Sequence, residues 1–468
     1  MIVDRYDAVN LFALVPQLGT GFDAALRELD VLLDDDVIFQ RVKADLIRAH
    51  PHSSHKGRHS TPVEVILRML LVRRLYHWSY EETEHFVADS LVLRQFCRIY
   101  LEAVPDDTTL IRWAHLVQPQ TLDHINERVV QLARERTVTR GRKLRVDSTV
   151  VETNSHHPTD SALLADSVRV ISRLLRRAKG LLGDTTEVSK ARFRTRNRSV
   201  RRLTQQLHRV ARRKGEEAAE ELTDTYRRLI RVAEQSRAQA VQVVTALTHS
   251  SAEAEQRLVR ELDHVLPLVE QVIEQAKRRV IQGETVPASE KVVSLFEPHT
   301  QIIKRQKPGK PVEFGRKLWL EEVEGGIVSG YRVLDQPGQD APHFPQSLAD
   351  HQRRFGKPPW LVAGDRGVFS PANERLATEA GVTHVVIPYA GKASAKRRQQ
   401  EKTRWFRAGF RFRAGIEGRI SVLGRRYGLD RCPEHGEAGM GRYVGWGIIT
   451  SNLAKIAETV AGRPAKTA

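Results

Sequence analysis

The chain has 468 residues, enough for two or three domains, and its 40% hydrophobic content is sufficient for a sizeable core. Lys and Arg total 75 against 57 Asp and Glu, and this excess indicates nucleic acid rather than a membrane as partner. No apolar stretch has the length of a membrane span, and the N-terminus lacks the pattern of a secretory signal. The two cysteines, Cys97 and Cys432, indicate a reducing compartment. We therefore expect a cytoplasmic protein.

Residues 1–138 are predicted to form an all-helical domain. Leucines and valines recur at spacings of three and four over residues 22–37 and 63–76, which indicates one helix in each segment. Ser79-Tyr80-Glu81-Glu82 has the pattern of a capping box, which opens a helix. Several short helices with tight turns are typical of a helix-turn-helix DNA reader. A helical scaffold or dimerisation module fits the same pattern equally well.

A buried strand is predicted next, within residues 139–157. Leu144, Val146, Val150 and Val151 give an apolar, β-branched run, and Asp147 lies inside it. A carboxylate is costly to bury unless a metal or another cation compensates it. One such acid is ordinarily a solvated residue at a strand end, so Asp147 becomes a candidate only if other acids converge on it.

Residues 158–298 are predicted to be a basic helical insertion, because long helical stretches there contain almost no Pro or Gly. Between Arg173 and Lys214, fifteen Lys or Arg stand against two acids, which favours contact with phosphates over an ordinary solvated helix. Four arginines alternate within this tract: Arg192, Arg194, Arg196 and Arg198. A coiled-coil arm for self-association is the alternative, because one heptad stripe is apolar. The stripe comprises Leu222, Tyr226, Leu229, Ala233, Ala240, Val243 and Leu247, and only Ser236 interrupts it.

The predicted core resumes over residues 299–460. Residues 317–334 form a β-hairpin around Gly325-Gly326 in this prediction. A helix over 344–355, a strand over 361–363, a helix over 373–380 and a strand over 382–387 follow, in that order. Asp365 comes just past the strand over 361–363, at the edge of a sheet where ligands and catalytic groups collect in α/β proteins.

A second basic run, residues 392–413, contains nine Lys or Arg and one acid, with four aromatic residues between them. Basic side chains can neutralise phosphates while aromatic rings stack on bases, although a buried aromatic cluster is the simpler explanation for some of the rings. The helix predicted after this run carries Glu417. A closing helix over 443–457 and a frayed tail, residues 461–468, complete the chain.

Two acids carried by strands and one carried by a helix, Asp147, Asp365 and Glu417, can form a cage for divalent cations that prefer oxygen ligands. The segments that carry them resemble bacterial insertion-sequence transposases of the DDE class. The resemblance rests on residues 146–151, on residues 363–367 and on Phe410-x2-Arg413-x3-Glu417. In many of these transposases the third block reads Tyr-x2-Arg-x3-Glu-x6-Lys. Here Phe410 replaces the Tyr, Gly424 stands at the Lys position, and Arg425 follows one place later.

The resemblance implies an α/β ribonuclease-H-like core, a mixed sheet flanked by helices, with an all-helical N-terminal domain and a long helical insertion after the first core strand. It implies a transposase that cleaves transposon ends and transfers the strands into target DNA. Asp147, Asp365 and Glu417 then hold two Mg²⁺ ions roughly 3.5–4 Å apart, for which Mn²⁺ can substitute. The implied partners are double-stranded DNA, both inverted-repeat ends and target, and a second copy in a synaptic homodimer. The implied location is the bacterial cytoplasm, at the nucleoid when DNA is bound.

The residues expected to contact DNA are Arg413, Arg425, Arg192, Arg194, Arg196, Arg198, Lys396, Arg397, Arg398 and Trp405. A decayed or repurposed DNA-binding protein without catalysis is the alternative function, and Glu434 or Glu437 are alternative third ligands. Cys432-x2-His435 lacks the second pair of ligands that a structural zinc site needs. The sequence contains no phosphate-binding Gly-x4-Gly-Lys-Ser/Thr loop and no Gly-x-Ser-x-Gly elbow, so it does not indicate ATP hydrolysis or acyl transfer.

Overall fold

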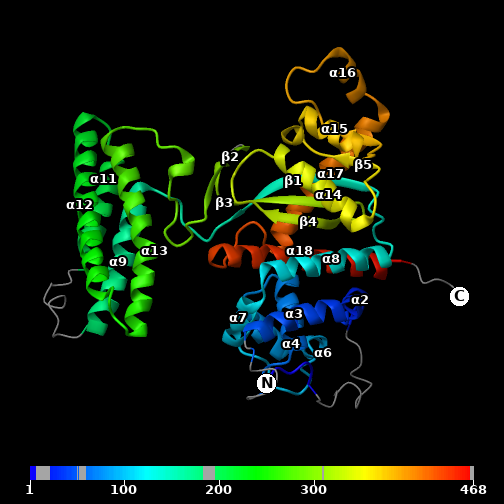
Figure 1. Cartoon of the computed structure of the whole chain (residues 1–468), viewed down its shortest axis with the longest axis horizontal. Coiled ribbons are helices and arrows are strands. Elements are labelled where there is room, and N and C mark those ends of the chain that lie inside the picture. The colour runs from blue at the N-terminus through cyan, green and yellow to red at the C-terminus, as the bar shows by residue number, and fades with distance from the viewer. Residues whose placement is uncertain (7–21, 50, 52–58, 183–194, 308–309, 464–468) are drawn as a thin grey trace. The chain divides into compact units, whose positions relative to one another are not determined.

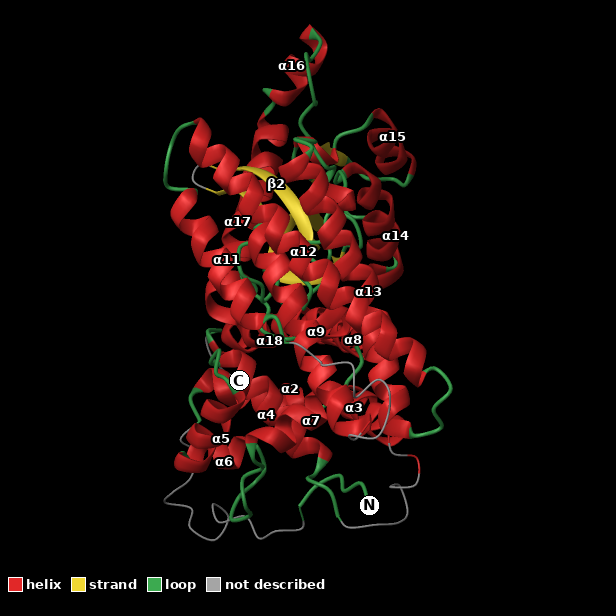
Figure 2. Cartoon of the chain, turned by 90° about the vertical axis from the view of Figure 1, so that its left-hand side faces the viewer, coloured by secondary structure: helices red, strands yellow, loops and turns green. Residues whose placement is uncertain are grey.

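The computed structural model describes residues 1–6, 22–49, 51, 59–182, 195–307 and 310–463. The chain divides into two compact units (Figure 1). The core unit comprises residues 1–152 and 316–468, and the helical unit comprises residues 153–315. Helices make up most of the described chain (Figure 2). No helix in these described ranges is long and apolar enough to cross a membrane.

The N-terminal part of the core unit is helical, as predicted. Its helices are α2 (Ala24–Leu33), α3 (Asp36–Ala49), α4 (Val63–Leu75), α5 (Tyr80–Asp89), α6 (Leu91–Phe96), α7 (Asp107–Leu116) and α8 (Pro119–Glu135). The single helix predicted over residues 22–37 is wrong, because α2 ends at Leu33 and Asp35 caps a new helix by accepting a hydrogen bond from Ile38 N at 3.1 Å. The capping box of Ser79 and Glu82 is confirmed at the start of α5.

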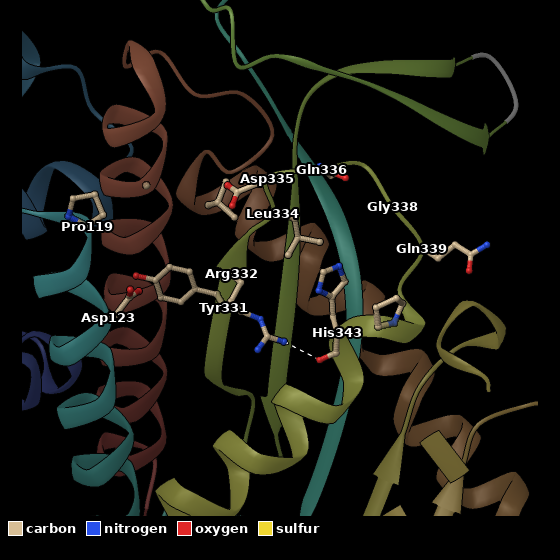
Figure 3. A pocket seen from close by; sticks show the side chains of 13 residues that line it. Pro119, Asp123, Tyr331, Arg332, Leu334, Asp335, Gln336, Gly338, Gln339 and His343 are labelled. Atoms are coloured by element: carbon tan, nitrogen blue, oxygen red, sulfur yellow. Dashed lines mark hydrogen bonds between the residues drawn. The ribbon is translucent and has the colours of Figure 1, made fainter. Parts of the chain in front are cut away.

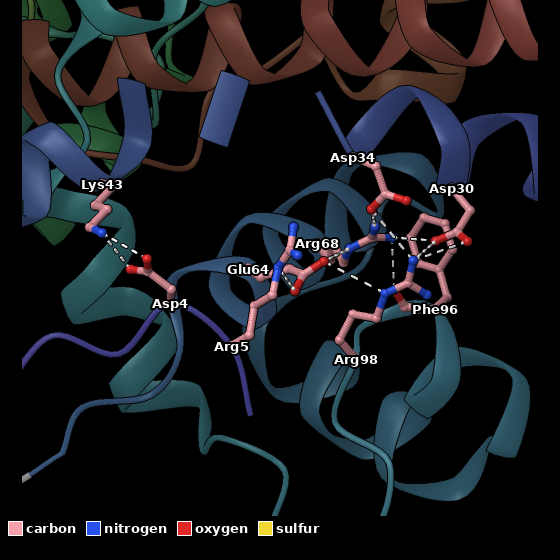
Figure 4. A network of polar contacts seen from close by, with 9 residues as sticks. All are labelled: Asp4, Arg5, Asp30, Asp34, Lys43, Glu64, Arg68, Phe96 and Arg98. Carbon is pink, nitrogen blue, oxygen red and sulfur yellow. Dashed lines mark hydrogen bonds and ion pairs between the residues drawn. The ribbon is translucent and has the colours of Figure 1, made fainter. Parts of the chain in front are cut away.

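A buried arginine ties these helices together (Figure 4). Arg68 on α4 is fully buried, and its guanidinium forms ion pairs with Asp30 and Asp34, each at 2.6 Å. Its Nε pairs with Glu64 at 3.3 Å, and Nη1 also donates to the Phe96 carbonyl at 3.0 Å. A buried cation persists only where such partners satisfy its donors. Arg68 therefore fixes α4 against α2 and the end of α6.

The core unit contains a mixed sheet. Its strands are β1 (Lys143–Glu152), β3 (Lys310–Val323, of which residues 316–323 belong to this unit), β4 (Ile327–Val333), β5 (Leu361–Ala363) and β6 (His384–Val386). Strand β4 pairs with β3 in antiparallel fashion, β3 neighbours β1, and β1, β5 and β6 follow in parallel. The hairpin turn at Gly325 and Gly326 is confirmed, and both residues have the positive φ that glycine adopts without strain.

Helices cover the sheet and complete one shared core. They are α14 (Phe344–Phe355), α15 (Pro371–Glu379), α16 (Ala395–Glu401), α17 (Arg404–Tyr427) and α18 (Gly436–Ala461). Side chains alternate along β1, so that Val146 joins the core with Leu348 of α14, whereas Val151 packs with Leu423 of α17. The largest cluster of buried side chains runs from α2 through the sheet to α18. Residues 1–138 and the sheet therefore share a core.

In its described residues the helical unit contains four long helices, α9 (Asp160–Leu182), α11 (Asn197–Val210), α12 (Glu216–Leu247) and α13 (Glu253–Ala276). A π-helix (Lys277–Ile281) and a 3-10 turn (Ala288–Glu290) follow, and β2 (Gln301–Lys307) then pairs antiparallel with residues 310–315 of β3. The heptad stripe of α12 is buried inside this unit, where Leu229 and Val243 pack in one cluster with Leu262 of α13. This stripe is therefore not available for a coiled coil with a second chain.

Candidate active site

Asp147 lies where β1 extends past its neighbour β5. The pairing of these strands ends at Arg145 and Ala363, two residues before Asp147. The Asp147 side chain is 11% exposed, and its Oδ1 accepts a hydrogen bond from the backbone N of Ser148 at 2.8 Å. The apolar run of β1 thus places one carboxylate at the edge of the sheet, close to the carboxyl end of β5.

Asp365 follows that carboxyl end directly. It caps a short 3-10 turn (Arg366–Val368) by accepting a hydrogen bond from Val368 N at 3.2 Å. The capping role uses Oδ1, so Oδ2 is directed elsewhere, and about a third of the side chain is exposed. The predicted position of Asp365 just past a strand is confirmed.

Helix α17 supplies the third acid and a cation. Two glycines allow α17 to approach the sheet closely: a Cβ at Gly409 would lie 2.5 Å from the Val386 side chain, and one at Gly415 would lie 2.3 Å from that of Arg145. Arg413 and Glu417 are four residues apart on this helix, so their side chains meet, and Arg413 Nη1 donates to Glu417 Oε1 at 2.8 Å.

All three acids contact the guanidinium of Arg413. Its Nη2 lies 2.8 Å from Asp147 Oδ2 and 3.9 Å from Asp365 Oδ2, in addition to the bond to Glu417. The exposed fraction rises from 11% for Asp147 through 35% for Asp365 to 69% for Glu417. Side chains that are 218 and 52 residues apart in the sequence therefore form one cluster, which opens to solvent at Glu417.

The electrostatic balance of the cluster favours further positive charge. Burial raises the pKa of the Asp147 carboxyl from 3.8 to about 6, and the charges of Asp365 and Asp340 act in the same direction. Arg413 and the Ser148 N–H lower it, but only in part. One arginine therefore does not fully compensate for the buried carboxylate and its acidic neighbours.

The donor chemistry of the cluster fits a hard divalent cation, because carboxylate oxygens are the ligands that Mg²⁺ and Mn²⁺ prefer. Within the described ranges, no three His, Cys, Asp or Glu side chains are grouped so that they could hold a metal ion. Around Asp147 the guanidinium of Arg413 is the shared partner of the acids. Binding of a cation by Asp147, Asp365 and Glu417 therefore requires Arg413 to turn away.

Asp340 belongs to the same neighbourhood and was not predicted. Its Oδ2 accepts a hydrogen bond from Ser148 Oγ at 3.0 Å, and its Oδ1 forms an ion pair with Lys317 Nζ at 2.7 Å. Asp340 comes from a Pro- and Gly-rich stretch between β4 and α14, which has no periodicity that would single out one acid. The only signal in the sequence is the position of this loop, after a strand and before a helix.

The alternative third ligands contact other partners. Glu437 pairs with Arg316 at 3.0 Å, and Glu434 lies 3.7 Å from Arg442. Glu417, by contrast, is bonded to Arg413 at 2.8 Å, and Arg413 also contacts the two aspartates. Glu417 is therefore the better candidate for the third acid.

The predicted DNA contacts in the helical unit have different environments. Arg192 and Arg194 lie outside the described residues. Arg196 donates to the side chains of Gln235 and Gln239. Arg198 is exposed on α11, and the apolar side of that helix is buried. Of these four arginines, Arg198 is the one whose described environment leaves its side chain exposed for a phosphate.

The candidates in the second basic run also differ. Arg397 makes contacts within the core unit, because it binds Glu401 at 3.1 Å and the Ile387 carbonyl at 2.6 Å. Trp405 stacks on His384 with ring centroids 4.8 Å apart and packs on the cluster around Phe406. The exposed basic candidates are Lys396, Arg398 and Arg425.

A cavity of about 690 Å³ lies beside the segment that carries Asp340 (Figure 3). Its walls come from α8, β4, α18 and residues 334–343. Figure 3 shows the Tyr331 hydroxyl directed toward Asp123, and burial raises the pKa of both groups. Arg332 Nη2 donates to the His343 carbonyl at 3.0 Å and so ties one end of the segment to β4.

Comparison with known proteins gives one positive finding. Residues 14–116 match the family model "Transposase domain (DUF772)", which supports a transposase and a function in transposition. The matched range ends at Leu116, the last residue of α7, and so lies before the sheet that carries the acids. No curated protein and no solved structure matches the chain.

Proposed function

We propose that the protein is a transposase of the DDE class, in which Asp147, Asp365 and Glu417 serve divalent-cation-dependent cleavage and transfer of DNA strands. One observation carries the proposal. An acid on β1, an acid just past β5 and an acid on α17 meet around the guanidinium of Arg413, beside the edge of a mixed sheet. The transposase-domain match in the same chain supports a transposase in general.

The topology supports a ribonuclease-H-like core. The strand order β4-β3-β1-β5-β6 combines an antiparallel hairpin with three parallel strands, and α14 and α15 alternate with the later strands. Along the chain, β1 is followed by the hairpin of β3 and β4, then by α14, β5, α15 and β6, and this agrees with the order of elements predicted from the sequence. Asp147 lies on β1, and Asp365 lies just past the end of its parallel neighbour β5, at the edge where α/β proteins place their catalytic groups.

The residues of the cluster have distinct parts in this proposal. Asp147, Asp365 and Glu417 would hold a pair of Mg²⁺ ions, which when bound would activate the attacking water or 3′-hydroxyl and stabilise the leaving oxygen. Asp147 is fixed by burial and by the Ser148 N–H, whereas the exposed Glu417 is free to adjust. Arg413, once released from the acids, can donate two parallel hydrogen bonds to the scissile phosphate.

The proposed partner is double-stranded DNA, both the inverted-repeat ends of the element and its target, bound by a homodimer in the bacterial cytoplasm. Helix α11 contains no Asp or Glu, and it exposes Arg198, Arg201, Arg202 and Arg209 while its apolar side is buried. A row of exposed arginines without acids is suited to the phosphate backbone. This face therefore supports a contribution of the helical unit to DNA binding.

A nicking assay tests the proposal. Supercoiled plasmid that carries the DNA flanking this gene is incubated with the protein in Mg²⁺ or in EDTA. We expect Mg²⁺-dependent nicks with the wild type, and none with Asp147→Asn, Asp365→Asn or Glu417→Gln, although the three variants still bind the DNA. Binding without cleavage by the wild type would instead identify a non-catalytic DNA-binding protein.

A further inference from the structure

We infer that Asp340 is a positioning residue of the proposed active site, which acts through Ser148 to hold Asp147 in place beside Asp365. The inference rests on the proposed function and adds a residue that neither the sequence pattern nor the transposase-domain match indicates. It is carried by the contacts of a strap, residues 335–343, that joins β4 to α14.

The strap is fixed to the core unit along its length. Lys317 Nζ on β3 donates to the Gly338 carbonyl at 2.7 Å, and Asn373 Nδ2 on α15 donates to the Ala341 carbonyl at 2.9 Å. Arg332 on β4 holds the His343 carbonyl. Backbone groups of the strap thus already have three anchors, so the side chain of Asp340 is not needed to attach it.

The Asp340 carboxylate instead points to the acid cluster. Its side chain is 14% exposed, and Lys317 at 2.7 Å compensates its charge through Oδ1. The other oxygen, Oδ2, binds Ser148 Oγ at 3.0 Å. The ion pair with Lys317 would be enough for Asp340 to hold the strap in place. The hydrogen bond from Ser148 is a second contact, and it joins Asp340 to the residue next to Asp147.

Ser148 connects the two acids. Its hydroxyl donates to Asp340, and its backbone N–H donates to Asp147 Oδ1 at 2.8 Å. Fixing the Ser148 side chain therefore restrains the peptide group that orients Asp147. Asp365 lies close to Asp340 as well. A Cβ on Gly367 would lie 3.2 Å from Asp365 Oδ1 and 3.6 Å from Asp340 Oδ2, so both carboxylates lie beside the same glycine. The strap thereby brings Asp340 near Asp365 and links it to Asp147 through Ser148.

Groups that support a metal-binding or catalytic carboxylate in this way typically change cation affinity or activity by about 10–100-fold when they are removed. We therefore expect Asp340→Asn and Ser148→Ala each to weaken Mn²⁺ binding and to slow nicking by a factor of about that size. Because Asp340 acts through Ser148, the double variant should be no more impaired than the stronger single variant. Binding of duplex DNA in EDTA should stay unchanged.

The experiment measures Mn²⁺ affinity by titration calorimetry and the nicking rate at saturating Mg²⁺, with the full chain. Asp335→Asn is the matched control, because Asp335 lies on the same strap but is 95% exposed and pairs with Arg316. Ser148→Ala leaves the Lys317–Asp340 pair intact, so it decides the question if Asp340→Asn does not fold.

Two results would overturn the inference. One is an Asp340→Asn variant that binds Mn²⁺ and cleaves like Asp335→Asn. The other is a double variant whose loss is the product of two independent losses. Asp147→Asn separates these results from a failure of the proposed function: if it binds Mn²⁺ as tightly as the wild type, the acid cluster itself is not the cation site.

Discussion

Replacing Asp147 by Asn should stabilise the protein while it removes catalysis. The fold buries this carboxylate, and burial together with Asp365 and Asp340 raises its pKa from 3.8 to about 6 despite the bond to Arg413. A raised pKa means that the folded state binds the proton more tightly than the unfolded state. Proton binding by Asp147 therefore stabilises the fold fully below pH 3.8, and this stabilisation is lost as the pH rises to about 6.

The magnitude follows from the size of the shift. About two pKa units correspond to roughly 3 kcal/mol in the free energy of unfolding, at about 1.4 kcal/mol per unit. Asn has the shape of the protonated acid and no charge to bury, so we expect Asp147→Asn to be more stable than the wild type by about 1–3 kcal/mol at pH 7.5. The gap should shrink as the pH falls from 6 to 4.

Urea unfolding in EDTA between pH 4.5 and 8 measures this gap. Asp335→Asn serves as the control, since its exposed carboxylate has no burial to relieve. A variant Asp147→Asn that is less stable than the wild type at pH 7.5 would contradict the reasoning. That result would mean that the bond between Asp147 and Arg413 outweighs the cost of burying the charge.

Three further outcomes are expected. Arg413→Gln leaves the buried Asp147 without its cation, so the free energy of unfolding in EDTA should fall by about 1–3 kcal/mol, which is seen as a lower melting temperature. Added Mg²⁺ should restore more stability in this variant than in the wild type. Leu229→Ala, at a fully buried position of the helical unit, should lower the unfolding free energy by about 2–5 kcal/mol in calorimetry. Arg198→Gln with Arg202→Gln should reduce the slope of log K for DNA against log salt by about one for each phosphate that the variant no longer neutralises.

Each of these predictions has a control on the same helix or beside it. Arg425→Gln removes an exposed arginine from α17 without touching the acids and should leave the Mg²⁺ response unchanged. Val241→Ala alters a side chain of α12 that is 40% exposed, so its effect on stability should stay within about 0.5 kcal/mol. Arg213 already pairs with Glu221 at 2.7 Å, and Arg213→Gln should not change the salt slope. Equal effects of test and control variants would contradict the corresponding prediction.

The sequence predicted the parts of the fold that local patterns specify. Helix α14 and strand β5 have the predicted bounds, because Phe344–Phe355 ends at a glycine with positive φ and the apolar run Leu361–Ala363 is short and sharply bounded. The sequence does not predict the boundary between α2 and α3, because Leu33 and Val37, on either side of the three acids at positions 34–36, keep a helical spacing of four. Only the hydrogen bond from Ile38 N to Asp35 shows that a new helix begins there.

The candidate site was predictable in its residues but not in its contacts. Asp147, Asp365 and Glu417 each follow a recognisable local pattern, and the structure brings them to one guanidinium. The partner role of Arg413 is a tertiary contact that spacing along the chain cannot show. Asp340 reaches the cluster because of the path of an irregular strap, which no local pattern predicts. Arg397 and Trp405 contact other parts of the core unit, and the sequence does not show these tertiary contacts either.

We propose that three distant carboxylates form one cation site, and the anomalous scattering of Mn²⁺ in crystals of the protein tests this most directly. We predict an anomalous peak bonded to the carboxylates of Asp147 and Asp365 and near Glu417, with Arg413 turned away from Asp147. Crystals soaked in millimolar Mn²⁺ that show no peak at these acids, and an Arg413 guanidinium still bonded to Asp147, would contradict it.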